Sequence, residues 1–165
     1  MRSPSPRPVL PVEVLAADHG SFPTSPEWRT RVAEALAQCL PVAEGALLTS
    51  IQAITSIEAK QAMFRDTGAR AVDMESAAVA QVAALHRLPV LVARVIVDTA
   101  TDTLPSCVMA ASQSGALHMG RLMTALMRTP SQIIDLIRLA RRFRAANSAL
   151  RAVGRTRSLR EALAP

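Results

Sequence analysis

"AVDMESAAVAQVAALHRLPVLVARVIVDTA", residues 71–100, is the stretch that decides the fold. Its short apolar start ends in two carboxylates, Asp73 and Glu75, and is followed by an alanine-rich run typical of a helix that packs closely on a sheet. Residues 89–97 are apolar at nearly every position and lead to Asp98. Such a run indicates a central strand that is covered on both faces. The stretch therefore predicts a strand, a helix and a second strand in succession.

The sequence on either side continues this alternation. Capping residues mark the helix ends, as with Ser56 before one helix and Gly68 after it, and Lys60 is expected on the solvent side of that helix. The pattern predicts an α/β layered domain with a central mixed sheet flanked by helices. The expected helices are 24–40, 56–68, 75–87, 106–127 and one that starts at Pro130, and the expected strands are 12–20, 45–54, 69–74 and 89–97.

The length of 165 residues fits one domain with its own core, and 50% of the residues are hydrophobic. Four prolines by position 11 predict an irregular lead-in over residues 1–11. The domain itself is expected over residues 12–150, and a basic tail over residues 151–165.

The net charge of +6 comes from the C-terminal end of the chain. From Arg138 onward there are eight of the 19 basic residues and one of the 13 acidic residues, so the rest of the chain has a net charge of −1. Aromatic residues make up 2% and there is no Tyr, which argues against base stacking on a nucleic acid. The charge pattern predicts an anionic surface as partner of the tail and no nucleic-acid binding by the body.

Cysteine usage and the ends of the chain indicate a cytoplasmic location. Cys39 and Cys107 match no metal or redox spacing, which favours two reduced thiols over a disulfide. The longest apolar run, residues 88–96, is too short to cross a bilayer, and the N-terminal residues lack the apolar segment of a signal peptide.

Two acids follow apolar strands, Glu75 after Met74 and Asp98 after Val97. Ligands of α/β sheets gather beyond the carboxyl ends of the strands, so both side chains are candidates for a binding site. Their positions also fit a structural interpretation, in which Glu75 interacts with a helix dipole and Asp98 caps a turn.

The two motifs together, Asp73-Met74-Glu75 and then Arg94-x-Ile96-x-Asp98, resemble the nucleoside phosphorylase and nucleosidase family. Within that family, "DTATDTLP" and "TPSQIIDLIRLARRFRAANSAL" are similar to the hopanoid-associated branch, the adenosylhopane nucleosidases or phosphorylases. The resemblance implies an enzyme that cleaves a purine N-glycosidic bond and releases adenine from adenosylhopane. It also implies a homo-oligomer that needs no metal and no cofactor, with phosphate as a conceivable co-substrate.

The resemblance assigns a role to each motif residue. Asp98 would protonate the purine at N7, which requires a proton on its carboxyl group near neutral pH. Glu75 would stay ionised, accept hydrogen bonds from the ribose hydroxyls and stabilise the positive charge that develops on the sugar. Met74 would pack under the ribose and Asp73 would orient the turn. The further substrate-binding candidates are Asp73, Arg94 and Ser50.

Three departures from the family pattern bear on activity. Val97 stands where many nucleosidases have Ser, and no aromatic residue stands near residues 51–53 to stack on the base. The family's opening strands and Gly-rich turns have no counterpart before Val12, which implies that the chain lacks the N-terminal part of the fold. Hydrolysis and phosphorolysis therefore both stay open. The alternative to an enzyme is an inactive remnant that binds a nucleoside or a partner subunit.

The helix after Pro130 combines isoleucines with arginines. Such a helix can lie in a membrane interface, held by apolar burial and by attraction to anionic lipid. It can equally pack on the domain with its arginines in water, so peripheral contact with the inner membrane is one of two expectations for this segment.

Overall fold

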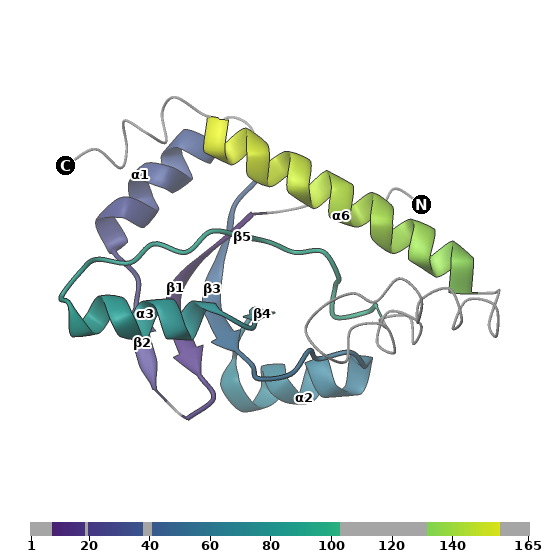
Figure 1. The fold of residues 1–165 in the computed structure, drawn as a ribbon, viewed down its shortest axis with the longest axis horizontal. Helices are drawn as coiled ribbons and strands as arrows, with labels where there is room; N and C mark the ends of the chain where they lie inside the picture. The colour runs from purple at the N-terminus through teal and green to yellow at the C-terminus, as the bar shows by residue number, and fades with distance from the viewer. Residues whose placement is uncertain (1–7, 19, 38–40, 103–131, 156–165) are drawn as a thin grey trace.

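The computed structural model describes residues 8–18, 20–37, 41–102 and 132–155. It confirms the expected fold class, a mixed α/β domain with a central sheet flanked by helices (Figure 1). The elements are β1 (Pro8–Ala16), β2 (Ser21–Pro23), α1 (Pro26–Ala37), β3 (Ala43–Thr49), α2 (Ile57–Thr67), β4 (Ala71–Asp73), α3 (Ser76–Leu85), β5 (Arg94–Val95) and α6 (Gln132–Arg155). The helix expected over residues 106–127 lies outside the described residues.

The sheet has the strand order β2-β1-β3-β4, and β5 pairs with β1. Strand β3 runs parallel to both β1 and β4, while β2 and β5 run antiparallel to β1. Thr49 at the end of β3 is in register with Asp73 at the end of β4. The carboxyl ends of parallel strands meet at one edge of a sheet, so this register places Asp73 and the residues after it at that edge.

The irregular lead-in expected over residues 1–11 is wrong for its last four residues, because β1 begins at Pro8. Proline is tolerated at the first residue of a strand and at a bulge, where no ladder hydrogen bond is lost. Pro8 is the first residue, and the register with β3 shifts between Pro11 and Glu13. The same shift changes which side chains share a face, so that Val9 and Val14 belong to one cluster although five positions separate them.

Two apolar clusters cover opposite sides of β1. One contains Val9, Val14, Leu47, Ala71, Ala80 and Val92 and includes the inner face of α3. The other contains Leu10 with Val32 and Leu36 of α1. Each fully buried Val or Leu contributes roughly 1.5–3 kcal/mol of hydrophobic stabilisation, so these clusters hold the helices on the sheet.

The central strand expected over residues 89–97 is wrong, because only Arg94 and Val95 pair with the sheet. The backbone of β1 on that side is already paired further along with β2, from Glu13 to Leu15, which leaves room for β5 only beside Pro8 and Val9. The expected coverage on both faces is nevertheless present. Val90 packs on the first cluster, whereas Leu91 packs on the second.

The helices α2 and α6 follow the expected boundaries. The Ser56 side chain accepts a hydrogen bond from the amide of Ala59, and Gly68 ends α2 with a left-handed φ of 68°. Helix α6 includes the first five residues of the predicted basic tail, and residues 156–165 lie outside the described part. Among the described residues, no helix combines the length and the apolarity that a membrane crossing requires.

Candidate active site

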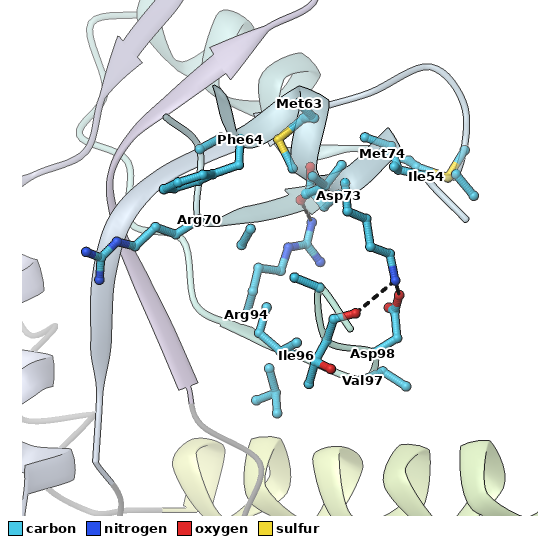
Figure 2. A pocket seen from close by; sticks show the side chains of 18 of the residues that line it. Ile54, Met63, Phe64, Arg70, Asp73, Met74, Arg94, Ile96, Val97 and Asp98 are labelled. Carbon is cyan, nitrogen blue, oxygen red and sulfur yellow. Dashed lines mark hydrogen bonds and ion pairs between the residues drawn. The ribbon is translucent and has the colours of Figure 1, made fainter. Parts of the chain in front are cut away.

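A cavity of about 910 Å³ lies beyond the carboxyl ends of β3 and β4 (Figure 2). Its wall comes from five parts of the chain, which are the turn after β3, α2, the end of β4, the segment from β5 to residue 100, and α6. The motif residues that line it are Asp73, Met74, Glu75, Arg94, Ile96, Val97 and Asp98. The two motifs recognised in the sequence therefore meet at one cavity.

Asp73 is hydrogen-bonded within the protein on both carboxylate oxygens. Its Oδ1 accepts from the Thr49 hydroxyl at 2.9 Å and from the Ser76 amide at 3.2 Å, and its Oδ2 accepts from the Ser76 hydroxyl and pairs with Arg94. Burial raises the pKa of Asp73, but the hydrogen bonds from Ser76 and Thr49 and the charge of Arg94 outweigh it, so the pKa lies below its ordinary value. These contacts fit the orienting role expected for Asp73. Its binding of substrate stays a prediction.

Arg94 joins the carboxylates at this edge of the sheet (Figure 2). One of its terminal nitrogens pairs with Asp73, lies 3.0 Å from the Ser76 hydroxyl and lies 3.4 Å from Glu75 Oε2. The Nε atom is buried and has no hydrogen-bond partner among the described residues. Arg94 therefore holds the start of α3 against β5, and the guanidinium also faces the cavity.

Glu75 and Met74 present their side chains to the cavity and to solvent. The Glu75 side chain is 77% exposed, and Met74 is 55% exposed. Glu75 stands at the N-cap of α3, but within the described residues its side chain makes no capping hydrogen bond. Asp73 accepts from the Glu75 and Ser76 amides, and the Thr49 hydroxyl accepts from the Ala77 amide. The carboxylate of Glu75 is thus left to meet a ligand, apart from its long contact with Arg94.

Asp98 forms an ion pair with Lys60, whose Nζ lies 2.5 Å from Asp98 Oδ2. The same Nζ donates to the carbonyl oxygens of Thr99, at 3.0 Å, and Asp102, at 2.7 Å. The expectation that Lys60 faces solvent is wrong, since the residue is only 9% exposed. Met63 and Phe64, three and four positions further along, also line the cavity, so Lys60 lies on the inner face of α2. This helical spacing is the sequence feature that predicts its inward position.

A short turn after Asp98 is tied to α6. The Asp102 carboxylate accepts hydrogen bonds from the amide and the hydroxyl of Thr99, at 2.8 and 2.7 Å, and pairs with Arg142. Burial raises the pKa of Asp102, but the Thr99 hydrogen bonds and the Arg142 charge outweigh it and hold that pKa below its ordinary value. The ion pair connects the turn to the helix that also brings Phe143 to the cavity.

Aromatic residues reach the cavity from elements outside the motifs. Phe64 of α2 and Phe143 of α6 both line it, and they are 54% and 60% exposed. The sequence lacks an aromatic residue near residues 51–53, and Ile51 there is 83% exposed. Packing of distant helices therefore supplies the ring faces that the local sequence does not.

Ser50 is not among the described residues that line the cavity. Its hydroxyl donates to the Gln52 carbonyl at 2.7 Å, and its amide donates to the Asp73 carbonyl at 2.8 Å. The side chain thus stabilises the turn after β3, and a direct contact with substrate stays a prediction. The described residues contain no group of three or more His, Cys, Asp or Glu that could hold a metal ion.

A cavity that lies beyond the ends of parallel strands and is lined by acids and an arginine defines a small-molecule site of the kind found in α/β enzymes. Residues 2–128 match the family model described as the phosphorylase superfamily, so the chain belongs to that superfamily. This confirms the family to which the motifs point. No curated protein matches the chain.

Solved structures share the fold at low sequence identity. The chain is similar to the Helicobacter pylori 5′-methylthioadenosine/S-adenosyl homocysteine nucleosidase, with a TM-score of 0.54, 22% identity and coverage of 58% of this chain and 48% of that one. A structure of a mutant of that nucleosidase with 5′-methylthioadenosine in the active site has a TM-score of 0.57 and 18% identity, and the match covers 74% of this chain and 61% of that one. A Helicobacter pylori futalosine hydrolase mutant has a TM-score of 0.51 and 22% identity, and the match covers 55% of this chain and 50% of that one. The chain thus spans about half the length of most of these structures.

Proposed function

We propose that this protein cleaves the N-glycosidic bond of a purine nucleoside. The observation that carries the proposal is that Glu75 and Asp98 line the same cavity, although one follows β4 and the other follows β5. The reaction needs one acid to protonate the leaving base and a second carboxylate to balance positive charge on the sugar. Support also comes from the family of the chain and from structural neighbours named as nucleosidases.

The proposed step has a defined course of protons and electrons. The Asp98 carboxyl group gives its proton to purine N7, while the bond between C1′ and N9 breaks and its electrons go to the base. Glu75 accepts hydrogen bonds from the ribose hydroxyls and stabilises the cationic sugar. C1′ then bonds to an oxygen of water or of phosphate. With water as the nucleophile, the proton that it loses restores Asp98. No metal or organic cofactor takes part in this scheme.

We further propose that the substrate is adenosylhopane and that adenine is the released base. The cavity of about 910 Å³ is at the upper end of the range of roughly 300–1,000 Å³ for small-molecule sites, which suits a nucleoside with a large substituent. Apolar side chains line much of it, including Met63, Phe64, Ile96 and Phe143. An apolar polycyclic substituent would remove these side chains from water.

A lipid-linked substrate gives the basic helix a role at the cytoplasmic side of the inner membrane, where we propose that the protein works. Ile137, Arg141, Arg144 and Arg151 are exposed and follow one stripe of α6, while Ala146 on the opposite side is buried. Each basic residue near an anionic surface contributes about 1 kcal/mol. Arg144→Glu combined with Arg151→Glu should abolish co-sedimentation with vesicles containing phosphatidylglycerol. Unchanged sedimentation of this variant would contradict membrane contact.

We also propose that the protein is a homo-oligomer. Helix α3 has three exposed apolar side chains on its outer side, Val79, Val82 and Leu85, which are 63%, 56% and 78% exposed. Patches of this kind mark interaction sites on soluble domains. Light scattering after size exclusion should give a mass above 17.6 kDa, and Val82→Asp should reduce it to that of one chain. A single-chain mass for the unmodified protein would refute oligomerisation.

The test of the proposed function is release of free base from purified protein. Adenosine, 5′-methylthioadenosine and adenosylhopane are incubated with and without phosphate, and the base and the sugar product are identified by mass spectrometry. A sugar 1-phosphate indicates phosphorolysis, and a free sugar indicates hydrolysis. Asp98→Asn should lower the rate on the order of 10²-fold or more, whereas Asp66→Asn, an exposed acid of α2, should leave it unchanged.

Absence of base release from folded protein would refute catalysis by this chain. Calorimetry with the same nucleosides then tests the alternative, a domain that binds a nucleoside without turning it over. The ion pair of Asp98 with Lys60 is the observation that favours this alternative, because Oδ2 of the carboxylate is already bonded to a group of the protein.

A further inference from the structure

Lys60 is the only lysine in a chain that has eighteen arginines. It is also buried, at 9% exposure, although long charged side chains are almost never buried unless they are paired. Lys60 belongs to α2, whereas the oxygen atoms that accept its hydrogen bonds belong to the segment 98–102. A single lysine at this place therefore joins two segments that both line the cavity.

The hydrogen bonds of Lys60 account for its full donor capacity. An ammonium has three N–H groups, and Nζ has three acceptors, Asp98 Oδ2 at 2.5 Å and the carbonyl oxygens of Thr99 at 3.0 Å and Asp102 at 2.7 Å. A neutral amine has only two N–H groups and would leave one acceptor unpaired. The geometry thus fits the charged form of Lys60, with no donor left for a substrate.

An arginine could not make the same contacts. The guanidinium is planar and larger, and it donates in a fixed fork, whereas the three acceptors here surround one nitrogen atom. The compact ammonium is the group that fits. This explains why a chain that uses arginine at all its other basic positions has lysine here.

We propose that Lys60 is a positioning residue for Asp98, which fixes the orientation of its carboxylate. This proposal rests on the proposed function, in which Asp98 donates a proton. Through its bonds to Asp98, Thr99 and Asp102, Lys60 aims the carboxylate and the turn 99–102 at the cavity.

Arg70 also lines the cavity, and the remaining charged groups near Asp98 form two ion pairs of their own. Arg142 of α6 pairs with Asp102, and Arg94 of β5 pairs with Asp73 and lies 3.4 Å from Glu75. Both arginines are thus bonded to acids other than Asp98. Among the contacts of the described residues, only Lys60 bonds to the Asp98 carboxylate. The charge next to Asp98 is therefore set by this one side chain, and a substitution of Lys60 changes it directly.

The first experiment needs no activity. Protein labelled with ¹⁵N-lysine contains one side-chain amine, so its Nζ spectrum has a single possible signal. Protons of a buried, hydrogen-bonded ammonium exchange slowly enough with water to be observed at neutral pH. We expect a signal in the unmodified protein that shifts or disappears in Asp98→Asn and is unchanged in Asp66→Asn. A signal that does not respond to Asp98→Asn, or no signal in the unmodified protein, would overturn the proposal.

The second experiment follows the rate. Lys60→Met keeps the length of the side chain without its charge, and we expect kcat to fall on the order of 10²-fold with KM within about threefold. Arg65→Met on the exposed side of α2 is the matched control and should leave both kcat and KM unchanged.

Chemical rescue separates positioning from a general effect on folding. In Lys60→Ala, propylammonium added to the solution should restore part of kcat, because it supplies an ammonium to the space that the side chain leaves, and it should have no effect on Lys60→Met. If the unmodified protein is active and Lys60→Met keeps its kcat, the proposal for Lys60 fails alone. If the unmodified protein releases no base, the proposed function fails, and the Nζ spectrum decides whether Lys60 holds Asp98.

Discussion

Asp73→Asn should destabilise the protein by about 2–4 kcal/mol at neutral pH. The Asp73 side chain is 11% exposed, and asparagine has nearly the same shape. Its single oxygen can still accept from Thr49 and from the Ser76 amide, but an NH₂ group replaces Oδ2, which accepts from the Ser76 hydroxyl and pairs with Arg94. Hydrogen bonds to charged groups contribute about 1.5–3 kcal/mol each, and two are lost. Arg94 is 35% exposed, so hydrogen bonds to water offset part of the stability that the loss of its pairing with Asp73 removes.

Urea unfolding followed by circular dichroism measures this difference. The matched control is Asp66→Asn, which neutralises an exposed carboxylate of α2 and should change the free energy of unfolding by less than about 0.5 kcal/mol. If Asp73→Asn is as mild as Asp66→Asn, the carboxylate does not hold the start of α3 in the way described.

The pH dependence of the same experiment has a defined sign. The pKa of Asp73 in the folded protein lies below the ordinary value of 3.8, because its hydrogen bonds and Arg94 outweigh burial. Its contribution is therefore fully present above pH 3.8 and is lost as the pH falls through the lower folded value. The gap between Asp73→Asn and the unmodified protein should be constant from pH 7 to about pH 5 and should shrink in more acidic solution. A gap that stays constant down to about pH 2 would contradict the assignment.

Three further predictions concern stability and activity. Gly68→Ala should cost about 1 kcal/mol in urea unfolding, because alanine at a φ of 68° is strained although its Cβ would meet no atom within 4 Å; no loss would contradict a left-handed end of α2. Leu47→Ala should cost about 2–5 kcal/mol, since the side chain is fully buried in the β3 core, and a smaller cost would mean that the cluster collapses around the space. Glu75→Gln should lower kcat/KM for a nucleoside on the order of 10²-fold while changing stability by less than about 0.5 kcal/mol, since this side chain is 77% exposed; an unchanged rate would remove Glu75 from the mechanism.

Local sequence patterns predict the site residues that directly follow apolar segments. Asp73 and Asp98 follow apolar runs, and parallel pairing of β3 with β4 brings the first of them to the carboxyl edge. The fold class follows from the same alternation of apolar runs and capped helices. The segment 89–97 is covered on both faces, as its apolar pattern predicts, but it is not a central strand, because that pattern depends on burial and not on hydrogen bonding.

The rest of the site depends on packing between distant elements, which no local pattern reports. Lys60 reaches Asp98 across 38 positions of sequence, and Arg142 reaches Asp102 across 40. Phe64 and Phe143 likewise come to the cavity from two different helices. A charged residue on a helix is exposed by default, so Lys60 could be distinguished from Glu58 and Arg65 only by its place on the stripe of Met63 and Phe64.

The pairing of charges around the cavity explains how three acids that line it can have different roles. Asp73 is held by Arg94 and Asp98 by Lys60, so their charges are neutralised within the protein. Glu75 has only a 3.4 Å contact with a guanidinium that Asp73 already pairs, and its side chain is 77% exposed. A positive charge that develops on a bound sugar would therefore be balanced best by Glu75. Lys60 holds the carboxylate that would act as the acid, which makes it as important to the proposed reaction as the motif residues themselves.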